Sequence, residues 1–331
     1  MTNHAAAFPD DSKCESVRVA RFAMATRFEI LLWGNEKIFL RAAGEEALRE
    51  IERLERQLNL FQPASEISRI NRSAAKKPLR VEPGLFRLLE QSKKLWEKTG
   101  GAFDITIGPL MHCWGFRGGD KPEPTPEEIA EAREQVGFQF VQLDPENRTI
   151  FFERTGLALD LGSVAKGWAL DEAALILQEE GVEHALLHGG TSTARAFGNA
   201  PIENAIGWKI AIQPPPPELM PGEKPWPEPY LETVTLQNEA LSVSGIGGRF
   251  LRRGDSVYGH VLDPRSGRPV RGSLLAALVH PIAADSDALS TALMAGGREL
   301  FEKFSNENPN SRILLLQENQ KRELKLLKNG F

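Results

Sequence analysis

The sequence predicts an α+β fold in which helices pack against mixed, largely antiparallel sheets. Two strand-like segments, residues 17–22 and 28–33, lie on either side of a short connection. Apolar residues recur at helical spacing in residues 40–58 and 83–98, which indicates long amphipathic helices. Strand and helix signals are interspersed without a regular strand–helix–strand alternation. This pattern favours α+β over a doubly wound sheet.

Local signals define the remaining elements. Residues 28–33 are apolar at every second position, as expected of a half-buried strand, and residues 65–71 form a short helical turn. The order Thr125-Pro-Glu-Glu128 has the capping-box pattern with proline at the first helical position, so a helix begins there and ends near Gln135. Further strands are expected at residues 148–152, 157–161, 208–212, 233–236, 241–243 and 258–263, and another runs from residue 185 into the Gly189-Gly190 turn.

The chain is expected to form a polar tail, residues 1–16, and a single domain, residues 17–331. Its 331 residues, 41% of them hydrophobic and 26% charged, are enough for a sizeable core. Residues 213–229 carry eight prolines and are expected to be an irregular excursion. Strand signals resume directly after them, so this segment is not a domain linker.

Composition excludes several classes of protein. The net charge is -5 and the basic residues are scattered, which argues against binding of duplex nucleic acid. Two cysteines, Cys14 and Cys113, are too few for a disulfide framework. No run is long enough for a membrane span. Residues 1–14 lack a signal-peptide pattern, so a cytoplasmic location is expected, with export open if a leader has been removed.

The central stretch, residues 157–171, runs from an apolar segment through a tight turn into a helix. Asp160 is the one carboxylate of the apolar segment. Ser163 is expected to cap the helix, with Gly162 beside it and Lys166 in the first turn. Free N–H groups at a helix start, together with a lysine, suit a phosphate group. A plain serine cap with a solvated lysine is the alternative interpretation.

Two further turns carry candidate site residues. Asp104 lies among apolar neighbours in a connection bounded by glycines, residues 99–109. It is either a site carboxylate or a local turn cap that binds its own backbone. Gly189 and Gly190 end a strand in a turn rich in hydroxyl groups, where backbone can approach a ligand closely. A plain hairpin turn is the competing interpretation.

The last two motifs complete the set. His260 is expected inside a strand that ends in a turn built by Asp263 and Gly267. Residues 283–296 open a helix that places Asp287, Ser290 and Thr291 on one face. Carboxylate and hydroxyl oxygens suit a hard cation such as Mg²⁺. An acidic helix cap that binds no metal would explain the same residues.

Taken in order, these motifs resemble those of the ApbE family of FAD:protein FMN transferases. The resemblance covers roughly residues 20–300, and its most specific parts are the last two motifs. The matching motifs are Met24-Ala-Thr26, Ser65-Glu-Ile-Ser-Arg-Ile-Asn71, Gly101-Ala-Phe-Asp104, Asp160-Leu-Gly-Ser-Val-Ala-Lys-Gly167, His260-Val-Leu-Asp-Pro-Arg-Ser-Gly267 and Asp287-Ala-Leu-Ser-Thr291. Two segments depart from the family pattern: Ala25 replaces the usual glycine, and residues 242–248 lack the usual acidic and aromatic residues.

The resemblance implies a T-fold-related architecture and an enzyme that uses FAD and Mg²⁺. Such an enzyme transfers FMN to a Thr or Ser hydroxyl of an acceptor protein and releases AMP. Carried over residue by residue, the resemblance implies FAD contacts from Met24, Phe61, Ala102, Phe103, Asp104, Asp160, Lys166, His260, Val261 and Leu262. It implies metal binding by Ser163, Asp287, Ser290 and Thr291.

His260 is the expected catalytic base, because an unperturbed imidazole titrates near neutral pH, and Asp160 is the reserve. A His260 that only forms hydrogen bonds in its strand is the alternative. Two other functions stay open: a Mg²⁺-dependent FAD pyrophosphohydrolase that uses the same site, and a flavin-binding protein without turnover.

Overall fold

The computed structural model describes residues 15–117, 121–202, 205–220, 225–247, 250–253, 256–319, 321 and 323–331. Most of the predicted tail, residues 1–14, lies outside this range. The first strand begins at Glu15, so the last two residues assigned to the tail are part of the sheet.

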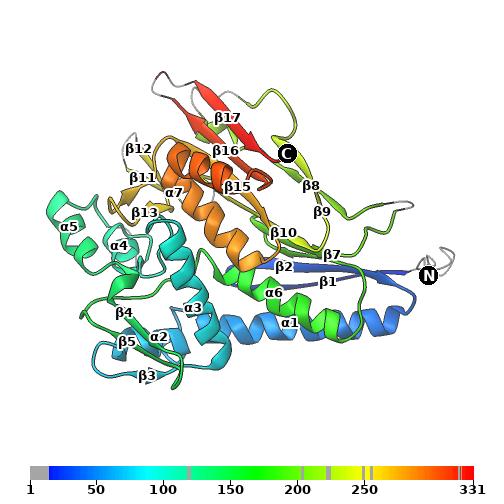
Figure 1. The fold of residues 1–331 in the computed structure, drawn as a ribbon, viewed down its shortest axis with the longest axis horizontal. Helices are drawn as coiled ribbons and strands as arrows, with labels where there is room; N and C mark the ends of the chain where they lie inside the picture. Colours follow the sequence, from blue (N-terminus) through cyan, green and yellow to red (C-terminus); the bar gives the residue numbers. More distant parts are fainter. Residues whose placement is uncertain are drawn as a thin grey trace.

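The main sheet has eight strands, and every pairing in it is antiparallel, which confirms the predicted α+β class (Figure 1). Its spatial order is β1-β2-β6-β7-β10-β15-β16-β17. The strands are β1 (Glu15–Ala23), β2 (Thr26–Gly34), β6 (Ala185–Gly189), β7 (Thr193–Phe197), β10 (Glu239–Gly245), β15 (Ser273–His280), β16 (Ile313–Glu318) and β17 (Leu324–Asn329).

Both faces of this sheet are covered. Three long helices, α1 (Lys37–Leu58), α6 (Ala165–Glu179) and α7 (Ala283–Glu307), pack on one face over Phe28, Ile30 and other inward side chains. A hairpin of β8 (Trp208–Ile212) and β9 (Glu232–Leu236) covers the other face. Because successive strand residues point to opposite faces, the two layers explain why nearly all of β15 is buried.

A smaller layer lies beyond the ends of α1 and α7. It contains α2 (Glu66–Ser73), α3 (Pro83–Lys98), α4 (Gly108–Cys113), α5 (Pro126–Glu134) and the sheet formed by β3 (Leu79–Arg80), β5 (Thr149–Phe152) and β4 (Val141–Asp144). The remaining elements are η2 (Phe138–Phe140), η3 (Pro217–Leu219), β11 (Phe250–Arg253), β12 (Ser256–Gly259), β13 (Leu262–Asp263) and β14 (Arg268–Pro269). The predicted capping box of α5 is confirmed: Thr125 and Glu128 each bond the other's backbone.

Three local predictions are wrong. Residues 157–161 are buried but form no strand, because their only ladder contact is an isolated bridge between Ala158 and Ile107. Ser163 does not cap α6, which begins at Ala165 with Val164 at the cap position. His260 lies between β12 and β13 rather than inside a strand.

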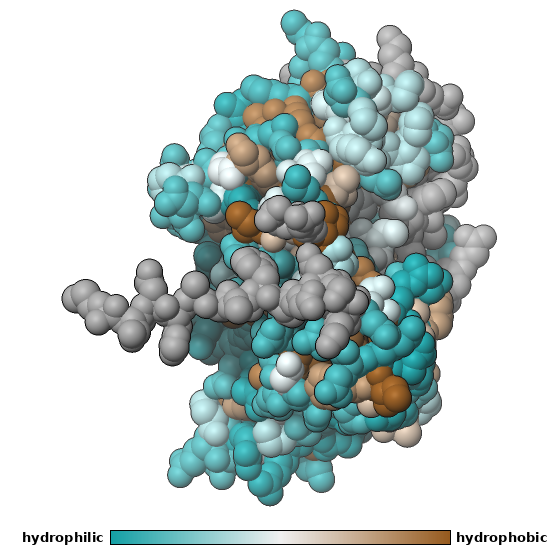
Figure 2. Space-filling model, turned by 90° about the vertical axis from the view of Figure 1, so that its right-hand side faces the viewer, coloured by the Kyte–Doolittle hydropathy of each residue, from teal (hydrophilic) through white to brown (hydrophobic). Residues whose placement is uncertain are grey.

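Figure 2 shows one face of the molecule. On the face shown in Figure 2, hydrophilic side chains predominate and hydrophobic ones form small separate patches. Within the described ranges, no helix is both long and apolar enough to cross a membrane.

Candidate functional site

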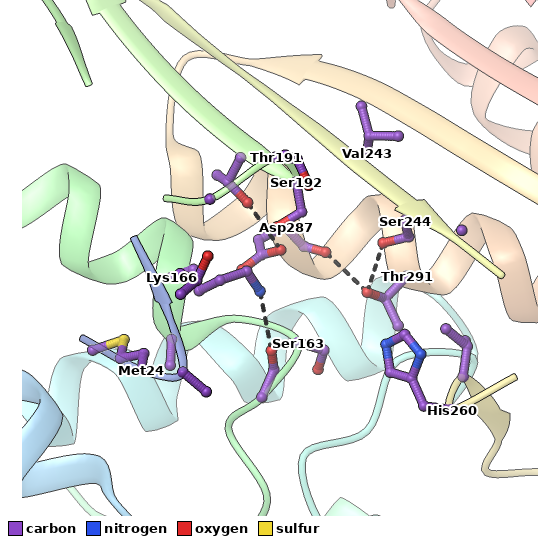
Figure 3. Close-up of a pocket in the computed structure, with 18 of the residues that line it drawn as sticks. Met24, Ser163, Lys166, Thr191, Ser192, Val243, Ser244, His260, Asp287 and Thr291 are labelled. Atoms are coloured by element: carbon purple, nitrogen blue, oxygen red, sulfur yellow. Dashed lines mark hydrogen bonds and ion pairs between the residues drawn. The ribbon is translucent and has the colours of Figure 1, made fainter. Parts of the chain in front are cut away.

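A cavity of about 1110 Å³ opens between the main sheet, the starts of α6 and α7 and the smaller helical layer. Cofactor sites usually enclose about 300–1,000 Å³, so this cavity can hold a ligand as large as a dinucleotide. Every predicted site residue except Ser290 lines it. Residues that are far apart in the sequence, such as Met24, Lys166 and Thr291, therefore meet in one place (Figure 3).

The start of α6 forms one wall of the cavity. Lys166 lies in its first turn, and its ammonium group contacts the Gly162 carbonyl oxygen at 3.4 Å. Ser163 lies in the turn just before the helix and faces the cavity. The predicted combination of a helix start, a hydroxyl and a lysine is present, although Ser163 is not the cap. This wall suits an anionic ligand.

Asp287 lies opposite, on α7, and the residue is only 4% exposed. Its Oδ2 accepts a hydrogen bond from Gly167 N at 3.2 Å and lies 3.5 Å from Lys166 Nζ. Thr193 donates its hydroxyl proton to Asp287 Oδ1 at 3.4 Å. Asp287 is not the helix cap, because α7 begins four residues earlier and Ile282 holds the cap position. The alternative of a capping carboxylate is therefore wrong for this residue.

Three hydroxyl groups lie beside Asp287. Ser290 Oγ and Thr291 Oγ1 donate to the Asp287 carbonyl oxygen at 3.0 and 3.1 Å. Ser244 Oγ, from β10, is within 2.8 Å of Ser290 Oγ. It also lies 3.1 Å from Thr291 Oγ1 (Figure 3). Ser290 is fully buried behind Thr291, so it contributes to this network rather than to the cavity wall.

The donor atoms around Asp287 fit a hard divalent cation. Asp287, Thr291 and Ser163 present only oxygen atoms to the cavity, which Mg²⁺ prefers over nitrogen or sulfur. In the described part of the chain, no three carboxylate, histidine or cysteine side chains cluster into a metal site. A cation here would therefore need oxygen atoms from water and from the ligand as well. Mg²⁺ usually binds in this way when it is shared with a phosphate.

Asp160 is held by its neighbours. Its Oδ1 accepts from Gly162 N at 2.8 Å, and its Oδ2 forms an ion pair with Arg117. The Asp160 amide donates to the Ile105 carbonyl oxygen at 2.6 Å, which fixes the backbone without a strand ladder. Both carboxylate oxygens of Asp160 therefore have partners within the protein.

His260, Val261 and Leu262 form another part of the wall. In Figure 3 the His260 ring lies next to Thr291. Because this residue is in a bend between two short strands, its side chain is not constrained by the alternation of a sheet. His260 and Thr291 both line the cavity.

The far end of the cavity is apolar. Met24 and Ala25 form the two-residue turn between β1 and β2, and both have positive φ angles, +49° and +59°. Glu55 on α1 accepts a hydrogen bond from Met24 N at 2.8 Å and so holds this turn. Phe61 projects at the rim with 70% of its surface exposed. A flat aromatic ring system would find apolar contacts here.

Asp104 lines the cavity, yet its hydrogen bonds are local. Oδ1 accepts from Thr106 N at 2.8 Å and from Thr106 Oγ1 at 2.7 Å, and Oδ2 accepts from Phe138 N at 3.1 Å. Burial raises the pKa of this carboxyl above its usual value. The turn-cap interpretation is confirmed, and a direct contact with a ligand stays a prediction.

Several wall residues were not assigned a role from the sequence. Arg117 and His188 carry no motif that marks them. Thr193 and Ser244 lie in segments that the sequence marks, the hydroxyl-rich turn and residues 242–248, but their place beside Asp287 depends on which strands become neighbours. Burial lowers the pKa of His188 below its usual value, which favours the neutral ring. The Gly189-Gly190 turn is a hairpin between β6 and β7, and it also borders the cavity through Gly190. Residues 213–216 add the first part of the proline-rich excursion to the wall.

Comparison with known proteins gives consistent matches. The model of the ApbE family matches residues 24–315. The chain is 28% identical over 255 residues to the FAD:protein FMN transferase of Vibrio cholerae, which covers 76% of this chain and 72% of that protein. It is 31% identical over 236 residues to the FAD:protein FMN transferase of Rhodobacter capsulatus, which covers 70% of this chain and 42% of that protein.

Solved structures agree with the sequence comparison. The crystal structure of the ApbE protein of Thermotoga maritima superposes with a TM-score of 0.81 at 26% identity and covers 94% of this chain and 96% of that one. The flavin transferase ApbE of Vibrio cholerae also gives a TM-score of 0.81, at 25% identity, and covers 96% of this chain and 97% of that one. The predicted ApbE-like architecture is therefore confirmed.

Proposed function

The chain belongs to the ApbE family, and we propose that it transfers the FMN moiety of FAD to a Thr or Ser hydroxyl of an acceptor protein and releases AMP. Relatives named FAD:protein FMN transferase support this activity. The structural observation that supports it best is the pairing of Asp287 with Lys166 beside oxygen donors, in a cavity of dinucleotide size.

The pyrophosphate of FAD would lie between the start of α6 and the Asp287 face of α7. Lys166 and the turn at Gly162 and Ser163 would bind its negative charge. Asp287, Thr291 and Ser163 would hold Mg²⁺, which when bound neutralises charge on the pyrophosphate. The apolar end of the cavity at Met24 and Phe61 would take a ring system of the dinucleotide.

In the reaction, the acceptor hydroxyl oxygen forms a bond to the FMN phosphorus, and the bond from that phosphorus to the AMP oxygen breaks. His260 would take the hydroxyl proton, because it lines the cavity and its ring is drawn next to Thr291 in Figure 3. Asp160 is the weaker candidate, since its carboxylate is already bound to Arg117 and Gly162. Lys166 would stabilise the negative charge that develops on the departing AMP.

The test is incubation of the protein with FAD and Mg²⁺, with and without a protein that carries a candidate acceptor Thr. The expected result is AMP release together with an acceptor mass increase equal to one FMN moiety, both lost in EDTA. AMP release without covalent flavin would instead show an FAD pyrophosphohydrolase. FAD binding without AMP release would show a flavin carrier.

A matched pair of variants links the activity to the cavity. Asp287→Asn should abolish Mg²⁺-dependent AMP release, because it removes the only carboxylate in the proposed ligand set. Asp285→Asn is the control: Asp285 is on the same helix but bonds Gln91 and does not line the cavity. Equal loss in both variants would contradict the assignment of Asp287.

A further inference from the structure

The starts of α6 and α7 are joined by a carboxylate that plays no part in the proposed chemistry. Asp171, in the second turn of α6, accepts hydrogen bonds from Ala283 N and Ala284 N, each at 2.9 Å. These two amides are the first of α7 and have no partner within their own helix. Asp171 therefore caps α7 from a different helix, 112 residues away in sequence.

The same two helices are in close contact one turn earlier on α6. A Cβ atom at Gly167 would lie 2.2 Å from the Ala283 carbonyl oxygen, so only glycine allows this approach. Gly167 N also donates to Asp287 Oδ2. The position of Asp287 therefore depends on how α7 is seated against α6.

Arg195 of β7 completes the arrangement. Its Nε lies 3.6 Å from Asp171 Oδ1, and its guanidinium group donates to the Pro281 carbonyl oxygen, just before α7. Arg195 and Asp171 together hold the residues that lead into the helix. The side chain of Asp171 is only 18% exposed, so water competes little for these bonds.

We propose that Asp171 is a positioning residue for the reaction: by fixing the start of α7 against α6, it sets the place of Asp287 relative to Lys166 and Ser163. The link to the metal and the pyrophosphate depends on the proposed function. The seating of α7 does not depend on it. Groups that orient metal ligands without touching the metal typically change metal affinity by 10- to 100-fold when they are replaced.

Stability alone is a poor explanation for this carboxylate. Burial raises the pKa of Asp171 to about 6, so near pH 7 the protein carries an ionised group that its surroundings disfavour. Arg195 favours the charge, whereas Asp285 on α7 opposes it. His280 of β15 lies 3.8 Å from Asp285, and Lys98 of α3 acts in turn on His280. A neutral residue would be easier to bury in this position.

The experiment compares Asp171→Asn with the wild type in the full chain, without and with FAD and Mg²⁺. Each of the two amides bonds a different carboxylate oxygen, so an asparagine in the same place turns its NH₂ group, which cannot accept, toward one of them. Amide hydrogen exchange of residues 283–287 without ligands should quicken by about tenfold or more. The Mg²⁺ concentration for half-maximal AMP release should rise about tenfold, with little change at saturating Mg²⁺. The melting temperature at pH 8 should not fall.

Asp285→Asn is again the control, because it leaves both amides bonded to Asp171; exchange and the Mg²⁺ midpoint should stay within twofold of the wild type. A folded Asp171→Asn protein with wild-type exchange and a wild-type midpoint would overturn the proposal, as would a lower melting temperature with no other change. If Asp171→Asn does not fold, Asp171→Glu provides the test, since it displaces the carboxylate by one methylene. Wild-type exchange and midpoint in Asp171→Glu would overturn the proposal.

The two proposals can fail separately. A wild type that releases no AMP with Mg²⁺ would remove the proposed function, while amide exchange in the metal-free variant would still show whether Asp171 seats α7. Normal wild-type activity with unchanged exchange in the variant would remove only the positioning role.

Discussion

Lys166 and Asp287 form an ion pair of 3.5 Å between the starts of α6 and α7, in which the aspartate side chain is 6% exposed and the lysine side chain 21%. Asp287 also accepts hydrogen bonds from Gly167 N and from the Thr193 hydroxyl, and these two donors stabilise the carboxylate together with the lysine. The lysine is the more accessible partner. Its ammonium group balances the carboxylate here, and a divalent cation bound at the same oxygen atoms would take over that role.

Replacement of the lysine should therefore destabilise the metal-free protein. In Lys166→Met the nearly buried Asp287 carboxylate loses its counter-charge, which should lower the free energy of unfolding by about 1–3 kcal/mol in EDTA. Millimolar Mg²⁺ should restore more stability to this variant than it adds to the wild type, because it replaces the missing charge. Urea unfolding with EDTA and with Mg²⁺ measures both effects.

Arg298→Met is the matched control for this experiment. Arg298 pairs with Glu302 at 2.6 Å, but both side chains are more than half exposed, so the change should be within about 1 kcal/mol and insensitive to Mg²⁺. A Lys166→Met protein as stable as the wild type in EDTA would show that Asp287 does not need the lysine.

The β1–β2 turn gives a second prediction. Ala25 has a φ of +59°, in the left-handed region of the backbone. Residues other than glycine adopt this conformation only with strain. Ala25→Gly should raise the free energy of unfolding by about 0.5–1 kcal/mol, after allowing for the greater freedom of glycine in the unfolded chain. Ala20→Gly, in the middle of β1, should have the opposite effect by a similar amount. Destabilisation by Ala25→Gly would mean that the methyl group packs usefully in the turn.

Elements defined by local signals were predicted well from the sequence. The bounds of α3 agree at both ends, and the capping box of α5 is present, because both depend on residues within one or two turns. Residues 157–161 were assigned to a strand because they are apolar. Burial explains their composition equally well, and their backbone hydrogen bonds go to loop residues such as Ile105.

The site was predicted through its motifs, and the residues outside those motifs were missed. Asp287 and Lys166 belong to two of the motifs recognised in the sequence, and the fold brings the two motifs into contact. Ser244 and Asp171 matter because of the strand order and the seating of one helix on another. Neither relationship can be read from spacing along the chain.

His260 gives a third prediction, which separates chemistry from binding. His260→Asn keeps much of the shape and one donor, so FAD affinity should stay within a few-fold of the wild type. Transfer of FMN at saturating FAD and Mg²⁺ should fall by roughly two to four orders of magnitude, because the proton acceptor is lost. Single-turnover transfer and flavin fluorescence measure the two quantities on the same preparation.

Two other results would reassign the residue. Parallel losses of affinity and rate would mean that His260 only holds the ligand. A rate near that of the wild type would move the proton to water or to Asp160, and Asp160→Asn would then be the next variant to measure.

The last prediction concerns pH and stability at Asp171. Its pKa is raised from 3.8 to about 6 in the folded state, so the folded protein binds this proton more tightly than the unfolded chain does. The contribution of Asp171 to stability is therefore full below about pH 4 and is lost as the pH rises through 6. A shift of about two pKa units corresponds to a loss of about 3 kcal/mol.

Asp171→Asn cannot titrate, so the free energy of unfolding of the wild type minus that of the variant should fall by up to this amount between pH 4 and pH 8. Urea unfolding at half-unit pH steps measures the difference, and contributions from groups common to both proteins, such as His280, largely cancel in it. If this difference in the free energy of unfolding stays flat or rises with pH, the folded state does not disfavour the ionised carboxylate. Arg195 and the two α7 amides would then stabilise the charge by more than burial destabilises it.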